Sequence, residues 1–332
     1  MKIGLVNNFL RDETRVCATP ETVKKFIADG HIVFIEEGAG YQSGFEDAAY
    51  AKTGALIKQR ADVLTADFIL SVMPPLKTDL HFFKENQWLL CDLTSFDHKA
   101  DLQDLAKTDI GVIDMGKMPR ITRAQSMDIL SSQTMLAGYK AALIALNALS
   151  QTAPLMITAA GTLLPVKAVI VGAGVAGLSA ISVLKRMGAN VVATDIRPES
   201  KSEIESVGGK FASDIKDELS GAHILISSAF SAGKKAPLLI KKEQIEQLPP
   251  HAVVIDMAQG NVELGFKRPD IYFIQNKYLQ RKLSFSASTL FANNVYSFLQ
   301  TFHYMQTNVD YEDEILRDVL VCFGGFLRGR MK

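Results

Sequence analysis

The chain has 332 residues, of which 48% are hydrophobic and 22% charged, and its 36 Lys and Arg residues balance 36 Asp and Glu residues. This length predicts two domains at roughly 100 to 200 residues each, and the ordinary composition excludes a disordered, collagen-like or disulfide-stapled chain. A net charge of zero gives no general attraction for nucleic acid or anionic lipid, so we expect a compact soluble protein with no nucleic-acid partner.

The N-terminal portion of the chain alternates short apolar runs with helical patterns. The N-terminus lacks a sustained apolar segment and carries charge at Arg11 and Asp12, so we expect no signal peptide and a cytoplasmic protein. Pro20 stands where a first helical residue would, and Gly30 stands where that helix would end. The apolar runs are typical of strands in a parallel α/β domain. These predicted strands cover residues 3–6, 32–36, 68–72, 88–93 and 110–115.

A long helical pattern from Arg123 to Leu149 predicts a helix that connects this domain to a second one. Apolar runs then resume and predict a second parallel sheet. Its predicted strands cover residues 167–172, 190–195, 222–228, 252–257 and 271–276. The tail from about Ser284 shows helical patterns at 288–304 and 311–321 but no strand pattern, and we expect it to pack on the first domain.

These patterns predict an α/β fold of two Rossmann-like domains with parallel sheets, joined by long helices and with a cleft between them. The first predicted domain comprises residues 1–125 plus about 284–332, and the second comprises residues 126–283. The uncharged run 168–184 approaches the length of a membrane span. Its glycines separate a β-branched run from an Ala/Leu/Ile run, which indicates a strand, a turn and a helix, so we expect no direct membrane insertion.

A GxGxxG motif lies at that turn. Gly172 would permit a tight turn, Gly174 would let backbone amides approach a pyrophosphate, and Gly177 would let helix and strand pack closely. Asp195, at the end of the next predicted strand, can accept ribose hydroxyls and would repel a 2′-phosphate, which favours NAD(H) over NADP(H). Arg197 leaves this preference open, and a glycine-rich turn that binds nothing is the alternative. The same predicted site includes Val175, Ala176 and Ile196.

The cysteines and histidines add no metal site. The three cysteines, Cys17, Cys91 and Cys322, are far apart and form no CxxC spacing, which indicates a reducing compartment. The six histidines form no close pairs. We therefore expect no bound metal.

Three stretches resemble the alanine dehydrogenase and pyridine nucleotide transhydrogenase family. They are RDETRVCATPETV (11–23), PRITRAQSMDILSSQTMLAGYKA (119–141) and LMITAAGTLLPVKAVIVGAGVAGLSAI (155–181), the last continuing to ATDIRPE (193–199). The second and third look most like the NAD(H)-binding domain I of the α subunit of the proton-translocating transhydrogenase. The resemblance is colinear over most of the chain.

In that family, the loop matching residues 119–128 holds the nicotinamide end of NAD(H) so that it faces the partner nucleotide. The resemblance implies this role for Arg120, Gln125 and Asp128, and it implies that Ser131 contacts the same half of the cofactor. The residues by themselves offer donors and acceptors just before a long helix, which suits a ribose and a carboxamide. The alternative is capping, in which a hydroxyl residue starts the helix and Asp128 only favours its dipole.

Two loops at the ends of later predicted strands complete the expected cofactor site. The loop 227–237 resembles the transhydrogenase's mobile loop, and a solvated connection is the alternative. It contributes Ser228, Ala229 and Gly233 to the predicted site. The segment 253–264 matches the family only incompletely, since a single glycine replaces the paired glycines and the loop is shorter. It contributes Gln259, Asn261 and Leu264.

The two activities of the family need different residues. An amino-acid dehydrogenase needs a cation and a general acid or base beside the nicotinamide. The positions that match its lysine and histidine are Ser71 and Thr94, although a shifted alignment would offer His98 instead. Arg15, which matches a substrate arginine of the dehydrogenases, is retained, but transhydrogenases retain it as well. A transhydrogenase only has to position one nicotinamide against another and exclude water.

The resemblance therefore implies an NAD(H)-binding subunit of a proton-translocating NAD(P)+ transhydrogenase. An NADP(H)-binding partner domain and membrane subunits would complete the complex, and this chain would form a homodimer that lies peripheral to the inner membrane through them. An amino-acid dehydrogenase of the alanine type is one alternative. A degenerate NAD-binding module without catalysis is the other, because of the shortened loop before Leu264.

Overall fold

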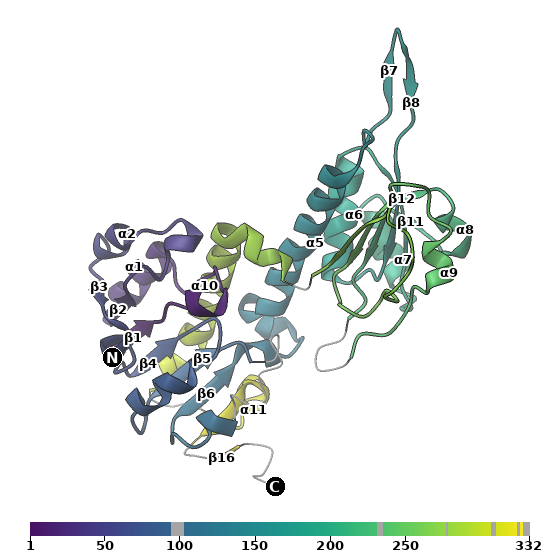
Figure 1. Cartoon of the computed structure of the whole chain (residues 1–332). Helices are drawn as coiled ribbons and strands as arrows, with labels where there is room; N and C mark the ends of the chain where they lie inside the picture. Colours follow the sequence, from purple (N-terminus) through teal and green to yellow (C-terminus); the bar gives the residue numbers. More distant parts are fainter. Residues whose placement is uncertain (94–102, 231–234, 277, 307–309, 324–325, 328–332) are drawn as a thin grey trace. The chain divides into compact units, whose positions relative to one another are not determined.

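The computed structural model describes residues 1–93, 103–230, 235–276, 278–306, 310–323 and 326–327. The chain divides into two compact units (Figure 1). Unit 1 comprises Met1–Gln133 and Leu283–Lys332, and unit 2 comprises Thr134–Lys282. The chain thus starts and ends in unit 1, and unit 2 is inserted between its two segments.

Unit 1 contains a mostly parallel sheet in the order β16-β15-β6-β5-β4-β1-β2-β3. Its strands are β1 (Lys2–Leu5), β2 (Ile32–Glu36), β3 (Leu56–Lys58), β4 (Phe68–Leu70), β5 (Trp88–Cys91), β6 (Gly111–Asp114), β15 (Leu320–Phe323) and β16 (Phe326–Leu327). The five strands predicted in this region of the chain are confirmed. The sequence pattern did not predict β3, which has only three residues and is incompletely buried.

The prediction that the tail has no strands is wrong. β15 pairs antiparallel with β6 and extends the sheet beyond it. The helix predicted at 311–321 is shorter, because α11 spans only Glu314–Val319 and the chain then becomes extended. A four-residue apolar run is too short for its period to separate strand from helix, and here pairing with the free edge of β6 decides the outcome.

The helices of unit 1 follow the predicted signals. They are α1 (Pro20–Ala28), α2 (Asp47–Ala51), α3 (Arg60–Val63), α10 (Ser284–Thr301) and α11. Pro20 is the first residue of α1, Thr19 caps it, and Gly30 follows its end with a positive φ of 88°. α10 buries Phe291, Val295 and other residues in the same core as β1 and β2, which confirms that the tail packs on the first domain.

Unit 2 contains a parallel six-stranded sheet in the order β11-β10-β9-β12-β13-β14. Its strands are β9 (Lys167–Val171), β10 (Asn190–Thr194), β11 (Lys210–Phe211), β12 (Ala222–Ser227), β13 (Val253–Asp256) and β14 (Tyr272–Gln275). Its further helices are α6 (Val175–Arg186), α7 (Ser200–Ser206), α8 (Lys216–Leu219) and α9 (Lys242–Ile245). β9, its turn and α6 confirm the interpretation of the uncharged run 168–184.

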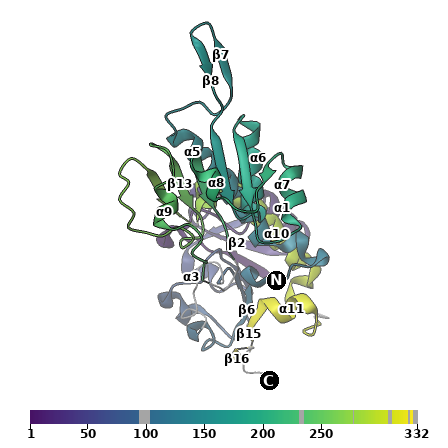
Figure 2. The ribbon, with the colours of Figure 1, turned by 90° about the vertical axis from the view of Figure 1, so that its right-hand side faces the viewer.

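The long connecting helix begins later than predicted. A 3-10 segment, Thr122–Met127, precedes α5, which spans Ile129–Ala148. α5 is long and apolar enough to cross a membrane by length and composition, a test that core helices also pass, and 39% of its apolar window is buried. After α5, β7 (Met156–Thr158) and β8 (Gly161–Leu163) form an antiparallel hairpin that projects from unit 2 in both views (Figures 1 and 2).

Candidate functional site

The glycine turn between β9 and α6 has the geometry that its motif predicts. Gly172 has a φ of 94°, and a Cβ added to it would lie 2.9 Å from the Ala229 nitrogen. A Cβ at Gly177 would lie 1.9 Å from the Gly172 carbonyl oxygen, so only glycine permits this helix–turn packing. A Cβ at Gly174 would meet no atom within 4 Å, so the N-terminus of α6 is open to a ligand on that side. The turn fits a dinucleotide pyrophosphate.

Asp195, just after β10, lies beside this turn. One carboxylate oxygen accepts a hydrogen bond from the Ala173 backbone N–H at 2.7 Å, and the other accepts one from the Arg197 backbone N–H at 2.9 Å. Partial burial would raise the pKa of Asp195, but these hydrogen bonds and the Arg197 guanidinium hold it below its ordinary value. The group is therefore an ionised acceptor at neutral pH, as a ribose-binding carboxylate must be.

Arg197 is held against the same carboxylate. Its Nε lies 3.1 Å from the Asp195 carboxylate, and its terminal nitrogen donates to the Ala173 carbonyl oxygen and lies 3.3 Å from Glu203. Its charge is therefore directed at protein acceptors in this structure. Ile196, between the two residues, is 97% exposed, and Val175 at the start of α6 is also exposed. Ala176 is partly buried, since its carbonyl packs against Gly138 of α5.

The loop after β12 reaches the glycine turn. The Ser228 hydroxyl donates to the Gly172 carbonyl oxygen at 3.0 Å, and Ala229 is the residue that a larger side chain at Gly172 would meet. Both residues thus lie at the turn, as predicted. Gly233 lies outside the described residues.

Asn261 is buried and ties three segments together. Its Oδ1 accepts from the Ser227 hydroxyl at 2.8 Å, and its Nδ2 donates to the carbonyl oxygens of Ala229 and Pro237. The amide therefore serves protein partners rather than pointing to solvent, although the sequence predicted a cofactor contact. Gln259 and Leu264, on the same loop, are exposed, and Gln259 has a positive φ of 55°.

The shortened loop after β13 is held by Asp256. This fully buried carboxylate accepts from the backbone N–H groups of Ala258, Gly260 and Val262. It also accepts from the Gln275 side chain at 3.1 Å. The loop has a defined structure despite its reduced length.

In unit 1, Asp128 caps α5. Its carboxylate accepts from the Ser131 backbone N–H at 3.0 Å and from the Ser131 hydroxyl at 2.5 Å. The structure therefore shows the capping role that the sequence left open for Asp128, without testing the ligand role. Arg120 and Gln125, earlier in the same segment, are exposed. The four residues predicted for the nicotinamide half thus lie within one short segment.

Contacts with the tail anchor this segment. The Arg123 guanidinium pairs with the Asp313 carboxylate at 2.6 Å. The Asn294 side chain of α10 donates to the Ser126 carbonyl oxygen at 2.7 Å and accepts from the Ser132 hydroxyl at 2.8 Å. Residues 119–132 are thereby fixed by elements that lie far away in the sequence.

Arg15 is buried and engaged by other side chains. Its guanidinium forms a two-point ion pair with Glu13, with both nitrogen–oxygen distances at 2.8 Å, and donates to the Gln133 amide oxygen at 2.8 Å. Burial lowers the pKa of Arg15, but the Glu13 carboxylate outweighs this and keeps the group charged. This arginine is therefore committed to Glu13 and Gln133.

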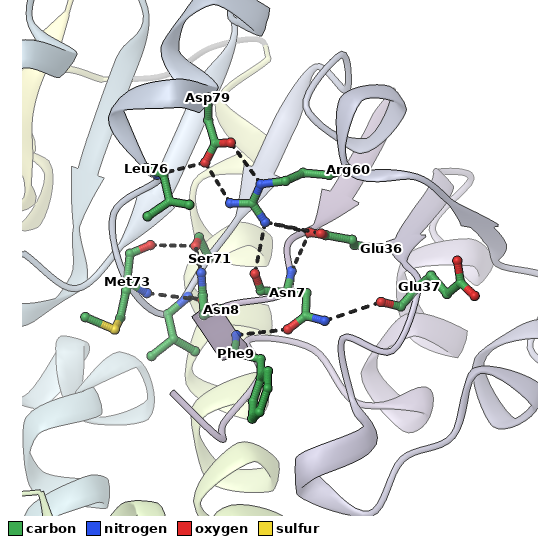
Figure 3. Close-up of polar contacts among 11 residues, drawn as sticks. Asn7, Asn8, Phe9, Glu36, Glu37, Arg60, Ser71, Met73, Leu76 and Asp79 are labelled. Atoms are coloured by element: carbon green, nitrogen blue, oxygen red, sulfur yellow. Dashed lines mark hydrogen bonds and ion pairs between the residues drawn. The ribbon is translucent and has the colours of Figure 1, made fainter. Parts of the chain in front are cut away.

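Ser71, at the end of β4, belongs to a second polar network of unit 1 (Figure 3). Its hydroxyl contacts the Asn8 side chain and donates to the Met73 carbonyl oxygen. Close by, Arg60 lies between Glu36 and Asp79, with nitrogen–oxygen distances of 2.9 and 2.7 Å. Side chains thus satisfy one another along this edge of the sheet. Thr94 and His98 lie outside the described residues.

Sequence reasoning missed Glu13, Asn8 and Asp256. Each is a polar residue beside a predicted strand or motif, but its partner lies elsewhere in the chain or in the loop backbone. Glu13 could have been suspected from its spacing, because it stands two residues before Arg15 in a segment that is otherwise apolar after Arg15. Among the described residues, no three His, Cys, Asp or Glu side chains gather as a metal site.

Comparison with known proteins gives two family matches. The alanine dehydrogenase/PNT N-terminal domain matches residues 4–137, and the C-terminal domain of the same family matches residues 141–329. The chain is 34% identical to the first portion of NAD(P) transhydrogenase subunit alpha of Rhodospirillum rubrum, over 90% of this chain and 89% of that one. It is 32% identical to the protein of the same name from Rickettsia prowazekii, over 98% and 95%. A transhydrogenase structure from Sinorhizobium meliloti is similar with a TM-score of 0.92 and 33% identity, over 98% of both chains.

Proposed function

Because the chain belongs to the alanine dehydrogenase/PNT family, we propose that it is the NAD(H)-binding subunit of a proton-translocating NAD(P)+ transhydrogenase. Its relatives named as transhydrogenase subunits support an oxidoreductase role in the family. Its share of the reaction is to present the nicotinamide of NAD(H) for direct hydride transfer to or from NADP(H) on a partner domain.

The observation that carries this choice is the state of Arg15. A dehydrogenase that acts on an amino acid needs a cation available for the substrate carboxylate. Here Glu13 neutralises Arg15 in a buried two-point pair, and Gln133 takes a further nitrogen. Ser71, which has no charge, replaces the catalytic lysine and is bonded to Asn8. Binding and positioning of the nucleotide is the chemistry that the remaining polar residues support.

The glycine turn and Asp195 are proposed to bind the ADP half. The α6 N-terminus would receive the pyrophosphate at Gly174, and the Asp195 carboxylate would accept the ribose hydroxyls. Arg120, Gln125 and Asp128, with Ser131, are proposed to orient the nicotinamide half. NAD(H) itself supplies the hydride donor or acceptor carbon, so the protein contributes orientation and exclusion of water rather than proton transfer.

The proposed complex needs other subunits. An NADP(H)-binding domain would supply the second nicotinamide, and membrane subunits would translocate protons, as the subunit names of the relatives suggest. We propose that this chain is a homodimer that stays in the cytoplasm and associates with the inner membrane through those subunits.

Parallel calorimetric titrations with NADH and NADPH test the proposal, followed by turnover assays on the same preparation. We expect NADH to bind and NADPH to bind far more weakly, with no oxidation of NADH by pyruvate and ammonia. Adding an NADP(H)-binding domain should allow NADPH to reduce an NAD+ analogue.

Turnover with pyruvate and ammonia would instead identify an amino-acid dehydrogenase, despite Ser71 and the pairing of Arg15. Failure to bind either nucleotide would identify a degenerate module. Binding of NADH without hydride exchange in the presence of the partner domain would contradict the transhydrogenase assignment.

A further inference from the structure

The hairpin of β7 and β8 carries an exposed apolar surface. Every residue from 154 to 164 is exposed, and this segment, here called the arm, contains no charged residue. Ile157 and Leu164 are 75% and 76% exposed. The remaining large apolar side chains of the arm are Leu155, Met156 and Leu163. Figures 1 and 2 both show the arm projecting away from the sheet of unit 2.

The base of the arm is fixed to unit 2. Ala153 and Val166 are buried there, and the Val166 backbone N–H donates to the Ala153 carbonyl oxygen at 3.0 Å. Pro154 packs so closely on Gly188 that a Cβ at that glycine would lie 2.5 Å from the proline Cβ. The arm is therefore a projection from an anchored base.

The arm presents apolar residues on both of its faces. Met156 pairs with Leu163 across the hairpin, and Ile157 pairs with Thr162 on the opposite face. An isolated two-stranded hairpin is marginally stable in water, and each exposed Ile or Leu would gain about 1.5–3 kcal/mol on full burial. Both faces thus favour a surface that encloses the arm.

α5, in the same unit, leaves an apolar face uncovered. Met135 and Tyr139 are spaced one helical turn apart and are both exposed. Leu136 and Leu143 are only partly buried beside them, and Lys140 is the single charged residue of the helix. The unit therefore carries both an apolar projection and an apolar face that could receive one.

We propose that the arm of one copy of this chain packs on the exposed α5 face of a second copy, and that the contact is formed twice around a two-fold axis. A surface and its receptor on the same chain are what a two-fold homodimer requires. This inference deepens the homodimer proposed above by naming its contact, and it does not depend on hydride exchange.

The chemistry of the surface favours a second copy over the other candidate occupants. Permanent homodimer interfaces are more apolar than those of transient redox encounters, which are small and polar. The seven large exposed side chains of the arm and α5 offer on the order of 600 Å² of apolar surface, close to the roughly 800 Å² per partner of a standard interface. An uncharged arm also lacks the lysines and arginines that bind anionic membranes.

Sedimentation velocity of the full chain tests this contact. We expect the wild-type chain to be a dimer, and we expect the double variant Ile157→Asp/Leu164→Asp and the single variant Tyr139→Asp to be monomers. Leu10→Asp is the matched control, because Leu10 is 77% exposed but lies in unit 1, and this variant should remain a dimer. Circular dichroism and NADH titration on each variant separate loss of the dimer from loss of the fold or of the proposed function.

A crosslink gives a second measurement that does not require weakening the dimer. One chain carries Ile157→Cys and the other Tyr139→Cys, and mild oxidation of the mixture should link the two different chains. The native cysteines Cys17, Cys91 and Cys322 are buried, so they should not compete.

Four results would overturn the proposal. They are a monomeric wild-type chain, a dimer that survives the arm variants, a dimer that survives Tyr139→Asp with no mixed crosslink, and arm-dependent binding of a monomer to phosphatidylglycerol/phosphatidylethanolamine vesicles. The last result would assign the arm to a membrane surface instead.

Discussion

At the scale of single residues, Asp195 combines a fixed position with a charge that is available to a ligand. Backbone N–H groups of Ala173 and Arg197 hold its two oxygens, and each oxygen keeps a further lone pair for a ribose hydroxyl. Arg197 contacts the same carboxylate from its exposed side. The pair explains how one short loop can both accept a ribose and disfavour a 2′-phosphate.

We expect Asp195→Asn to weaken NADH binding about 10- to 100-fold, because a hydrogen bond to a charged group contributes roughly 1.5–3 kcal/mol. The preference for NADH over NADPH should shrink as well, since the repulsion of a 2′-phosphate is lost. Calorimetric titration with both nucleotides measures the two effects. Asp214→Asn, which removes an exposed carboxylate of the same unit, should leave both affinities unchanged.

The low pKa of Asp195 also predicts how binding depends on pH. Because the pKa is below its ordinary value in the folded chain, the carboxylate's contribution is complete above the pKa of the unfolded chain and is lost only as pH falls through the folded value. NADH affinity should therefore be constant with respect to this group between about pH 5 and pH 8. A titration within that window that disappears in Asp195→Asn would contradict this assignment.

At the scale of elements, the strand–turn–helix from β9 to α6 could be predicted from the sequence because its signals are local. Three glycines, a β-branched run and an Ala-rich helix lie within one continuous stretch. β11 and β15 could not be predicted with the same certainty, since two to four residues carry no readable period. Their pairing with β10 and β6 comes from the rest of the sheet.

The candidate site was predictable to the same extent. The glycine turn and Asp195 come together as expected, because the end of one strand lies next to the end of its neighbour in a parallel sheet. The buried amide of Asn261 contacts Ala229 and Pro237, which lie 32 and 24 residues away in the chain. No local pattern reports such a contact, so the sequence could not separate a ligand-binding role from a role in holding the loops.

Two substitutions in the glycine turn should have opposite effects on fold and on binding. Gly177→Ala places a Cβ against the Gly172 carbonyl, so we expect a large loss of thermal stability and of NADH binding together. Gly174→Ala meets no atom of the chain, so its melting temperature should stay close to that of the wild type while NADH affinity falls at least tenfold. Differential scanning calorimetry and NADH titration distinguish them. Equal destabilisation by both variants would show that the open side of Gly174 is structural.

At the scale of the whole molecule, the two units divide inside α5 rather than before it. Gln133, in the first turns of the helix, donates to the Ala287 carbonyl oxygen and accepts from Arg15, so it belongs to unit 1. Four residues later, Ala137 already lies in the core of unit 2. The helix therefore serves two cores in succession.

The division predicts that residues 134–282 fold when expressed alone. They form a complete parallel sheet with its own apolar core, and they contain both the glycine turn and Asp195. This fragment should show cooperative thermal unfolding and bind 5′-AMP or ADP-ribose, while the affinity gained by adding the nicotinamide half should be absent. Fragment and full chain can be compared by calorimetry with ADP-ribose and NADH. A fragment that gains as much affinity from the nicotinamide as the full chain does would contradict this prediction.

The insertion of unit 2 into unit 1 has a consequence for synthesis on the ribosome. Residues 1–133 emerge first, but α10 and β15, which complete their core and pair with β6, are made only after all of unit 2. Unit 2 can therefore fold while the nascent N-terminal segment still exposes an apolar surface and an unpaired strand edge, the features that attract chaperones and promote aggregation. The later segment of the chain should reach its native state before the segment that was made first.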